Sequence, residues 1–268
     1  MNSKDYTEAN RMAWNQVNQS HQVKKEENGK FKKFAQSGYS TLDNVITEKL
    51  SFYGLIGKAI AQVCCNDGEE TMSLKNLGAR EVVGFDISDN AIQSARLLSK
   101  RVNVKCDFVQ TDIYDISDDY NNRFDIVYIS TGSLMWFPDI SKFFKVINRM
   151  LKVNGHVLIY EIHPFLLLLD EENRENPYEL RYSYFKNGPL VFNDGLDYIG
   201  KVKNESALPS YNFDPTFSQI INGLIQNKLS IDQFEEYNHD ISSLFGHLDN
   251  DDIQIPKSFF LCGKKASD

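Results

Sequence analysis

The stretch KAIAQVCCNDGEETMSLKNLGAREVVGFD, residues 58–86, decides the fold of this chain. Its Ala59 to Val63 segment is a short, largely apolar run, as expected for a buried parallel strand. Asn66-Asp67-Gly68 has the chemistry of a turn, residues 69–77 favour a helix, and Gly78 suits the end of that helix. A second apolar strand follows directly. The order strand, tight turn, helix, strand predicts a βαβ unit.

The second strand of this unit, residues 82–86, ends in Asp86 at what we expect to be an exposed strand end. A carboxylate in that place can accept hydrogen bonds from both hydroxyls of a ribose, so the unit predicts a nucleoside site. The alternative is that Asp86 only caps the helix that follows it. The residues by themselves leave both interpretations open.

Composition limits the class of protein to which the chain can belong. Its length of 268 residues predicts one elaborated domain or one and a half, and its 41% hydrophobic residues are enough for a real core. The net charge of −8 argues against a nucleic-acid partner. No run approaches the ~18 apolar residues of a membrane helix, and the N-terminus lacks the apolar centre of a signal peptide. The four cysteines show no CxxC spacing, so we expect a reducing cytoplasm and no metal site.

Strands and helices alternate through the middle of the chain. Pro138-Asp139 is expected to begin a helix whose apolar side extends to Leu151. We predict five strands at residues 59–63, 82–86, 104–109, 124–130 and 156–162. A polar, helical segment precedes them, with a charged connection at residues 24–33. We therefore expect an N-terminal helical lid at 1–50 and a main domain at 51–268.

The pattern changes in an insertion at about residues 165–212. Residues 182–185 and 190–192 are predicted to form a hairpin or short strands, and residues 210–215 a loop. The aromatic side chains of residues 178–198 suit either the cover of a substrate pocket or a minor hydrophobic core. The remaining predicted elements are a helix at 217–226 and strands at 229–237 and 258–262.

Taken together, these features resemble the class I S-adenosylmethionine-dependent methyltransferases, closely over residues 58–160. Within that superfamily the chain is similar to a bacterial small-molecule group with an N-R-x-x-W segment followed by His, and with His-Pro after the fifth strand. The matching residues are Asn10, Arg11, Trp14, His21, His163 and Pro164. The resemblance implies an α/β, doubly wound, mostly parallel seven-stranded sheet with helices on both faces. The last strand is expected to be antiparallel.

The family's glycine-rich turn falls on residues 64–68, where Gly68 is the glycine that remains. Cys64 and Asn66 occupy the other two glycine positions. Asparagine tolerates a left-handed backbone, which makes Asn66 a credible substitute. The acidic residue usual in the preceding strand is Gln62 in this chain.

The resemblance implies S-adenosylmethionine as the cofactor. Asp86 and Ile87 fall where the family binds the ribose, and Asp112 falls where it faces the adenine amino group. Ile113 would pack on the adenine ring, and Ser130 would line the reactive end of the cofactor. The alternative for Asp112 is a solvated carboxylate in an acidic segment.

Two tryptophans are candidate substrate-binding residues. Trp136 lies between Met135 and Phe137, a trio that suits either a substrate platform or ordinary core packing. Trp14 lies on the N-terminal helix, where the alternative is an anchor that docks the helix.

Methyl transfer requires a free lone pair on the acceptor, so a base is useful when the acceptor carries a proton. His163 is the preferred candidate, because it follows a strand end and titrates near neutral pH. A structural histidine in a rigid His-Pro turn is the alternative. Tyr39, His21 and Glu161 are lesser candidates.

The predicted function is transfer of a methyl group to a nitrogen or oxygen of a small molecule. One alternative is a non-catalytic scaffold that binds S-adenosylmethionine or another nucleoside. A nicotinamide-dependent oxidoreductase is less favoured, because the G-x-G-x-x-G spacing is absent. A homodimer is left open, and the acceptor is not identified.

Overall fold

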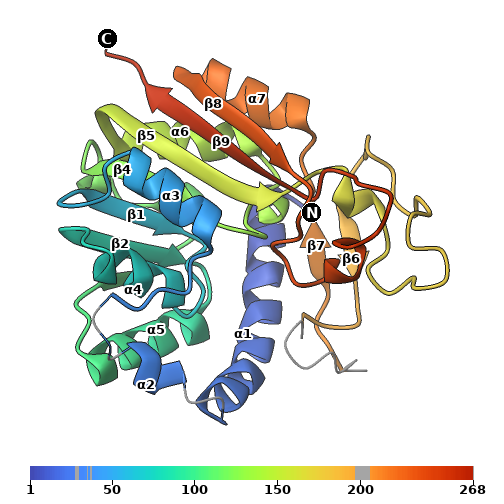
Figure 1. Ribbon diagram of the computed structural model, residues 1–268, viewed down its shortest axis with the longest axis horizontal. Helices are drawn as coiled ribbons and strands as arrows, with labels where there is room; N and C mark the ends of the chain where they lie inside the picture. Colours follow the sequence, from blue (N-terminus) through green and yellow to red (C-terminus); the bar gives the residue numbers. More distant parts are fainter. Residues whose placement is uncertain (28–29, 35, 37, 197–205, 268) are drawn as a thin grey trace.

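The computed structural model describes residues 1–27, 30–34, 36, 38–196 and 206–267, and within them the side chains of all but residues 18–27 and 30–31. A seven-stranded sheet with the order β3-β2-β1-β4-β5-β9-β8 forms its centre (Figure 1). Its strands are β1 (Ala59–Val63), β2 (Glu81–Asp86), β3 (Asp107–Gln110), β4 (Phe124–Ile129), β5 (Leu151–Ile162), β8 (Leu229–Tyr237) and β9 (Ser258–Lys265). The first five are parallel, and β9 runs antiparallel between β5 and β8. The predicted sheet, with its last strand antiparallel, is confirmed.

Helices cover both faces of this sheet, because successive strand residues point to opposite sides. Ile60 and Leu158 pack with Ile46 of one helix layer. Ala61 and Val157 pack with the opposite layer. The helices of the main domain are α3 (Asn44–Phe52), α4 (Glu69–Asn76), α5 (Asp89–Val102), α6 (Ile140–Met150) and α7 (Phe217–Gln226). Short 3₁₀ turns are η1 (Ile113–Asp115), η2 (Asp118–Tyr120), η3 (Leu134–Trp136), η4 (Leu166–Leu168) and η5 (Gly246–Leu248).

Two further parts lie at the carboxyl ends of the parallel strands. The N-terminal segment forms α1 (Ser3–Glu27) and α2 (Lys30–Phe34), and the insertion after β5 carries a two-stranded ribbon of β6 (Leu190–Phe192) and β7 (Ser210–Asn212). Figure 1 shows α1 standing between the central sheet and this ribbon. In the part of the chain that the structure describes, no helix has the length and apolar character needed to cross a bilayer.

The third and fifth strands begin at residues other than those that the sequence predicted. The third strand begins at Asp107 rather than Val104, because Val104 completes the end of α5. Its amide donates to the Ser99 carbonyl at 3.1 Å, and the Ser99 hydroxyl donates back to its carbonyl at 2.5 Å. Leu151 is extended rather than helical, and it pairs with Phe124 at the start of β5.

Of the hairpin or short strands predicted at residues 182–185 and 190–192, the strand at 190–192 is present, but the hairpin is wrong. Leu190–Phe192 pairs instead with Ser210–Asn212, which we expected to be a loop. The Asn187-Gly188 turn signal is local, whereas the true partner is about twenty residues away. Tyr198, the end of the predicted aromatic cover, lies outside the described residues.

The charged connection predicted at residues 24–33 is largely helical. Residues 24–27 continue α1, and the lysine-rich segment from Lys30 forms α2. Phe34 explains the second helix, because its side chain is 1% exposed and packs in a cluster with Ile92 and Leu98 of α5. An apolar anchor at the end of a run of good helix formers is enough to dock it.

Candidate active site

An open cleft of about 1740 Å³ lies at the carboxyl ends of the parallel strands. Typical small-molecule sites enclose about 300–1,000 Å³, so the cleft has room for more than one ligand. The predicted site residues that line it are Trp14, Tyr39, Cys64, Asn66, Asp86, Ile87, Asp112, Ile113, Ser130 and Trp136. Gly68, Glu161 and His163 are not among the lining residues. The His21 side chain lies outside the described part of the chain.

The turn after β1 forms one wall of the cleft through left-handed backbone. Cys64 has φ 54° and Asn66 has φ 48°, which confirms the backbone expected of Asn66 at a glycine position. Gly68 has φ 77°, and a Cβ built there would lie 2.4 Å from the Phe108 ring and 2.9 Å from Ala95. Packing beneath the turn therefore requires Gly68, which faces the core rather than the cleft.

Asp86 connects two turns at the end of β2. Its Oδ2 accepts the Asn66 N–H at 2.8 Å, and its Oδ1 accepts the Ser88 N–H at 2.9 Å. Burial raises the pKa of Asp86 to about 6, and the two N–H donors oppose this rise. The side-chain cap of α5 is Ser88, whose hydroxyl accepts the Ala91 N–H at 3.1 Å. The helix-capping alternative for Asp86 is therefore wrong.

Gln62 occupies the position where the family has an acid, and it forms a hydrogen bond with the carboxylate of Glu70 from the neighbouring helix. Its Nε2 donates to Glu70 Oε2 at 2.7 Å and to Ser130 Oγ at 3.2 Å, while Thr71 Oγ1 donates to its Oε1 at 2.6 Å. Glu70 lines the cleft, and burial raises its pKa to about 7. The sequence analysis missed Glu70, although the acidic pair at the start of α4 was its signal.

Asp112 is held by hydrogen bonds rather than freely solvated. Its Oδ1 accepts the Tyr114 N–H at 3.0 Å as the cap of η1, and its Oδ2 accepts the Thr7 hydroxyl of α1 at 2.7 Å. The adjacent Ile113 is 7% exposed and contributes an apolar surface to the cleft. A fixed carboxylate beside an apolar side chain is a suitable environment for a purine ring.

Glu161 holds the loop after β4 by hydrogen bonds to its backbone. Its carboxylate accepts the backbone N–H groups of Gly132, Ser133, Leu134 and Ile162 at 2.5, 2.7, 3.0 and 2.7 Å. Burial raises its pKa to about 7 against the lowering effect of these four donors. Glu161 is not among the residues that line the cleft, and this geometry favours a part in shaping the loop.

His163 has the surroundings of a structural histidine. It is 6% exposed, and its ring packs edge-on to Phe217 with centroids 4.7 Å apart. Nδ1 accepts the Phe165 N–H at 3.0 Å, so Nε2 carries the proton and donates to Glu236 at 2.8 Å. Burial lowers the pKa of His163, and Glu236 opposes this effect. Both ring nitrogens are occupied, which favours the structural alternative.

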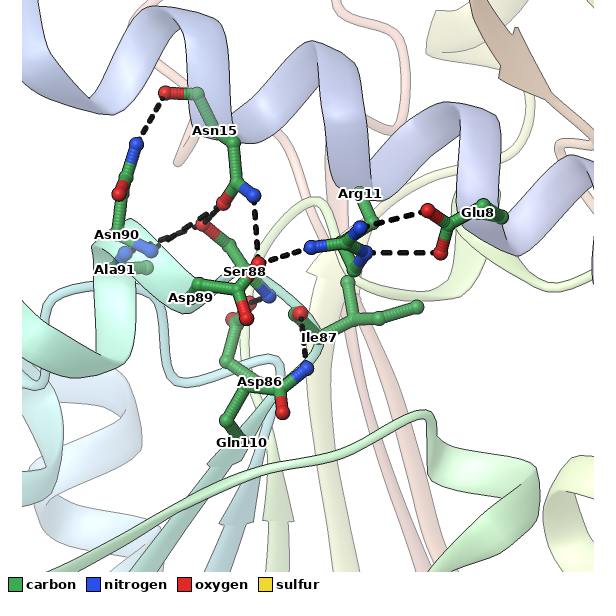
Figure 2. Close-up of polar contacts among 10 residues, drawn as sticks. All are labelled: Glu8, Arg11, Asn15, Asp86, Ile87, Ser88, Asp89, Asn90, Ala91 and Gln110. Carbon is green, nitrogen blue, oxygen red and sulfur yellow. Dashed lines mark hydrogen bonds and ion pairs between the residues drawn. The ribbon is translucent and has the colours of Figure 1, made fainter.

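Helix α1 docks on the turn after β2 through a group of polar side chains (Figure 2). Asn15 Oδ1 accepts the Ser88 hydroxyl at 2.7 Å, and its Nδ2 donates to Asp89 at 2.7 Å. Asn90 Nδ2 donates to the Asn15 carbonyl at 2.7 Å. Arg11 joins Asp89 to Glu8 within the same group. The helix is thus fixed at the edge of the cleft.

The same helix also binds the insertion. Asn10 Nδ2 donates to the Tyr211 carbonyl at 3.0 Å, and Tyr211 N–H donates back to Asn10 Oδ1 at 2.8 Å. Between the two docking regions, Trp14 meets Trp136 edge-to-face with centroids 5.5 Å apart and an interplanar angle of 76°. Both rings line the cleft, so they form an aromatic wall between α1 and η3.

One group of potential metal ligands is present among the described residues. The ligand atoms of His156, Asp232 and Cys262 lie within 4.8 Å of one another. Since these residues do not line the cleft, its chemistry does not depend on them.

Comparison with known sequences places the central unit in a family. A family described as "Methyltransferase domain" matches residues 61–159. Ubiquinone biosynthesis O-methyltransferase of Proteus mirabilis is 29% identical over 120 residues, which cover 45% of this chain and 47% of that protein. The chain thus matches about half the length of this curated relative.

Solved structures share the fold at low sequence identity. An S-adenosylmethionine-dependent methyltransferase from Mesorhizobium loti has a TM-score of 0.58 at 17% identity, covering 79% of this chain and 92% of that chain. Magnesium protoporphyrin IX methyltransferase from Synechocystis, solved with bound S-adenosylhomocysteine (SAH), has a TM-score of 0.52 at 15% identity, covering 84% and 81%. The resemblance to methyltransferases drawn from the sequence is confirmed for residues 61–159, which match a methyltransferase domain, and the chain has the fold of these solved structures.

Proposed function

We propose that this chain, whose residues 61–159 form a methyltransferase domain, is an enzyme that transfers a methyl group from S-adenosylmethionine to a small molecule. A nitrogen or oxygen of that molecule would receive the methyl group. The observation that carries the proposal is the cleft at the strand ends, where Asp86 and Asp112 line one cavity together with the left-handed turn at 64–66. In open α/β sheets this edge is the usual ligand site.

The described residues fit the proposed cofactor. Each oxygen of Asp86 accepts one backbone N–H and keeps a further lone pair for a ribose hydroxyl. Ile113 offers an apolar surface beside the fixed carboxylate of Asp112. S-adenosylmethionine would supply the activated methyl group, and the protein would bind it, orient it and exclude water.

For the acceptor side, we propose the aromatic pair of Trp14 and Trp136 as a wall of the substrate site. Tyr39 lines the cleft and remains a candidate for handling the acceptor's proton. The buried positions of Glu161 and His163 support roles in positioning and stability instead.

We further propose that residues 1–50 are a lid on the domain formed by residues 51–268, with the insertion at about 165–212 forming the acceptor side. The hydrogen bonds of Asn15 to the turn after β2, and of Asn10 to β7, support this division. Closure of such a lid keeps water from the reacting groups. The net charge of −8 favours a small molecule over nucleic acid as the acceptor, and the cysteine pattern favours a cytoplasmic enzyme.

Calorimetric titration with SAH and, in parallel, with NAD tests the proposal. We expect SAH to bind and NAD not to bind, with a gain of about 2.7 kcal/mol in unfolding free energy at 100 times the dissociation constant. Absence of SAH binding at millimolar concentration would overturn the cofactor assignment, and binding of NAD would favour an oxidoreductase. SAH binding without transfer to any component of a metabolite extract would favour a non-catalytic scaffold.

A further inference from the structure

Two hydrogen-bond acceptors on the insertion side of the cleft lack donors. Asn212, at the end of β7, and Asp214 both line the cleft. Their Oδ1 atoms are buried and accept no hydrogen bond from any described residue. Each such atom costs about 1–3 kcal/mol when it stays unsatisfied. Two of them, two residues apart beside one cavity, indicate that a ligand supplies the missing donors.

The other oxygen of Asp214 is paired with a lysine side chain. Oδ2 lies 3.2 Å from Lys186 Nζ, and the two side chains are 5% and 10% exposed. Burial raises the pKa of Asp214, and the Lys186 ammonium lowers it. One oxygen is therefore neutralised within the protein, while the second is left for a donor from elsewhere.

The backbone at Asp214 is strained and fixed. Its φ is 39°, although the residue before a proline normally prefers an extended conformation, and Pro215 follows. A conformation of this kind costs about 1–3 kcal/mol. The Phe213 N–H donates to the Met135 carbonyl at 2.7 Å, and Thr216 caps α7. The segment is thus held in place before any ligand arrives.

This segment lies next to the proposed site of transfer. Asn212 Nδ2 is 3.4 Å from the Met135 sulfur in η3, which follows Ser130 at the end of β4. The neighbouring Tyr211 is bound by Asn10 of the lid. The two open acceptors therefore belong to the acceptor side of the cleft, opposite the turn at the end of β1.

The charge of this side restricts what can bind. Among the described insertion residues, those with charged side chains that line the cleft are Asp170, Glu171, Glu172, Asp194 and Asp214 on the acidic side and Arg174 and Arg181 on the basic side. Arg181 is already paired with Asp170 at 2.9 Å. A cavity with this excess of negative charge attracts cations and repels carboxylates and phosphates.

We infer, building on the proposed function, that Asn212 and Asp214 bind N–H groups of the methyl acceptor, and that this acceptor is a small amine on an apolar or aromatic framework. The open oxygens provide the hydrogen bonds, the acidic side provides the charge preference, and Trp14 and Trp136 provide an apolar wall. The amine is recognised by these contacts whether or not its own nitrogen is the atom that receives the methyl group.

Three probes with the same ring and similar length test this inference: phenethylamine, 2-phenylethanol and 3-phenylpropionate. Their affinities are measured by ligand-observed NMR titration of the full chain, with and without saturating SAH. We expect phenethylamine to bind about tenfold more tightly than 3-phenylpropionate, with 2-phenylethanol between them. Equal affinities for all three probes would overturn the inference.

Two variants test whether Asn212 and Asp214 cause the tighter binding of the amine probe. Asn212→Leu removes one acceptor, and Asp214→Asn combined with Lys186→Met removes the carboxylate without leaving a buried ammonium unpaired. Each should reduce the amine preference to about threefold or less while SAH affinity stays unchanged. Asp252→Asn, the same carboxylate-to-amide change at an exposed site, should leave the preference intact.

The outcomes separate this inference from the proposed function. Retention of the full amine preference in both folded variants would overturn it even if SAH binds. Failure of SAH to bind would refute the proposed function, whereas the amine preference measured without SAH would still decide the role of Asn212 and Asp214.

Discussion

Gln62 and Glu70 form a hydrogen bond of 2.7 Å between strand β1 and helix α4, and this bond holds a carboxylate at the edge of the cleft. The family has its acid in the strand, where this chain has the neutral Gln62. The carboxylate comes instead from the first turn of the adjacent helix. The carboxylate that is missing from the strand is thus supplied by Glu70, whose side chain lies next to Gln62.

Glu70→Gln is predicted to weaken SAH binding about tenfold, because a carboxylate at this edge attracts the ammonium group of the ligand. Since the pKa of Glu70 is about 7, wild-type affinity should rise between pH 6 and 8 as the carboxylate ionises. The variant should show a flat profile over that range. Calorimetry at a series of pH values checks both, and an equal rise in the variant would contradict the assignment.

The same substitution should change the pH dependence of stability. The folded-state pKa of Glu70 lies above its usual value of 4.5, so the folded chain holds more protons than the unfolded chain between about pH 4.5 and 7. Its contribution to stability is therefore lost as pH rises through that window. Urea unfolding should show a shallower decline for Glu70→Gln than for wild type.

Asp86→Ala is predicted to weaken SAH binding about ten- to a hundredfold. The fold should also lose about 1–3 kcal/mol, because the N–H groups of Asn66 and Ser88 lose their acceptor. This corrects the expectation of an exposed strand end, since Asp86 is half-buried. Asp252→Ala serves as the exposed control. Unchanged SAH affinity in a folded Asp86 variant would remove the ribose role.

Asn15→Ala is predicted to loosen the lid, since it removes the side-chain hydrogen bonds to Ser88 and Asp89. Hydrogen exchange of residues 3–17 should become faster, and SAH affinity should fall about threefold to tenfold. Met12→Ala is the control, because Met12 is exposed on the same helix. If SAH fails to slow exchange in α1 of the wild type, the lid proposal is wrong.

His163→Gln is predicted to reduce unfolding free energy by about 1–3 kcal/mol while leaving turnover per folded molecule nearly unchanged. The folded-state pKa of His163 lies below its usual 6.5, so the unfolded chain gains the proton first as the pH falls below about 6.5. Stability is lost in that direction, and the variant should lack this part of the decline. A drop in turnover of about 10²–10⁴ in the folded variant would restore the base hypothesis.

The sequence correctly predicted those helices and strands whose sequence signal lies within the element itself. Strand β1 and helix α7 have the predicted bounds, because an apolar run and an amphipathic repeat need no distant partner. The left-handed turn at Asn66 was also visible as a glycine position occupied by asparagine. Most of the residues that the sequence suggested for cofactor binding do line the cleft.

The parts that could not be predicted depend on contacts distant in sequence. The contact of His163 with Glu236, which comes from β8, and the ion pair of Asp214 with Lys186 of the insertion are examples. The pairing of β6 with β7 likewise depends on the path of a long connection. Residue type and spacing carry no information about such partners, which decide burial and protonation.

Helix α1 contacts both halves of the cleft through residues three positions apart. Thr7 donates to Asp112 on the nucleoside side, and Asn10 exchanges two hydrogen bonds with Tyr211 on the acceptor side. Three residues of helix span about 4.5 Å, less than one turn. Because the two contacts lie so close together along the helix, the proposed opening of α1 as a rigid body would strain both of them at once. Lid opening would then give both ligands a way out of the cleft together rather than one after the other.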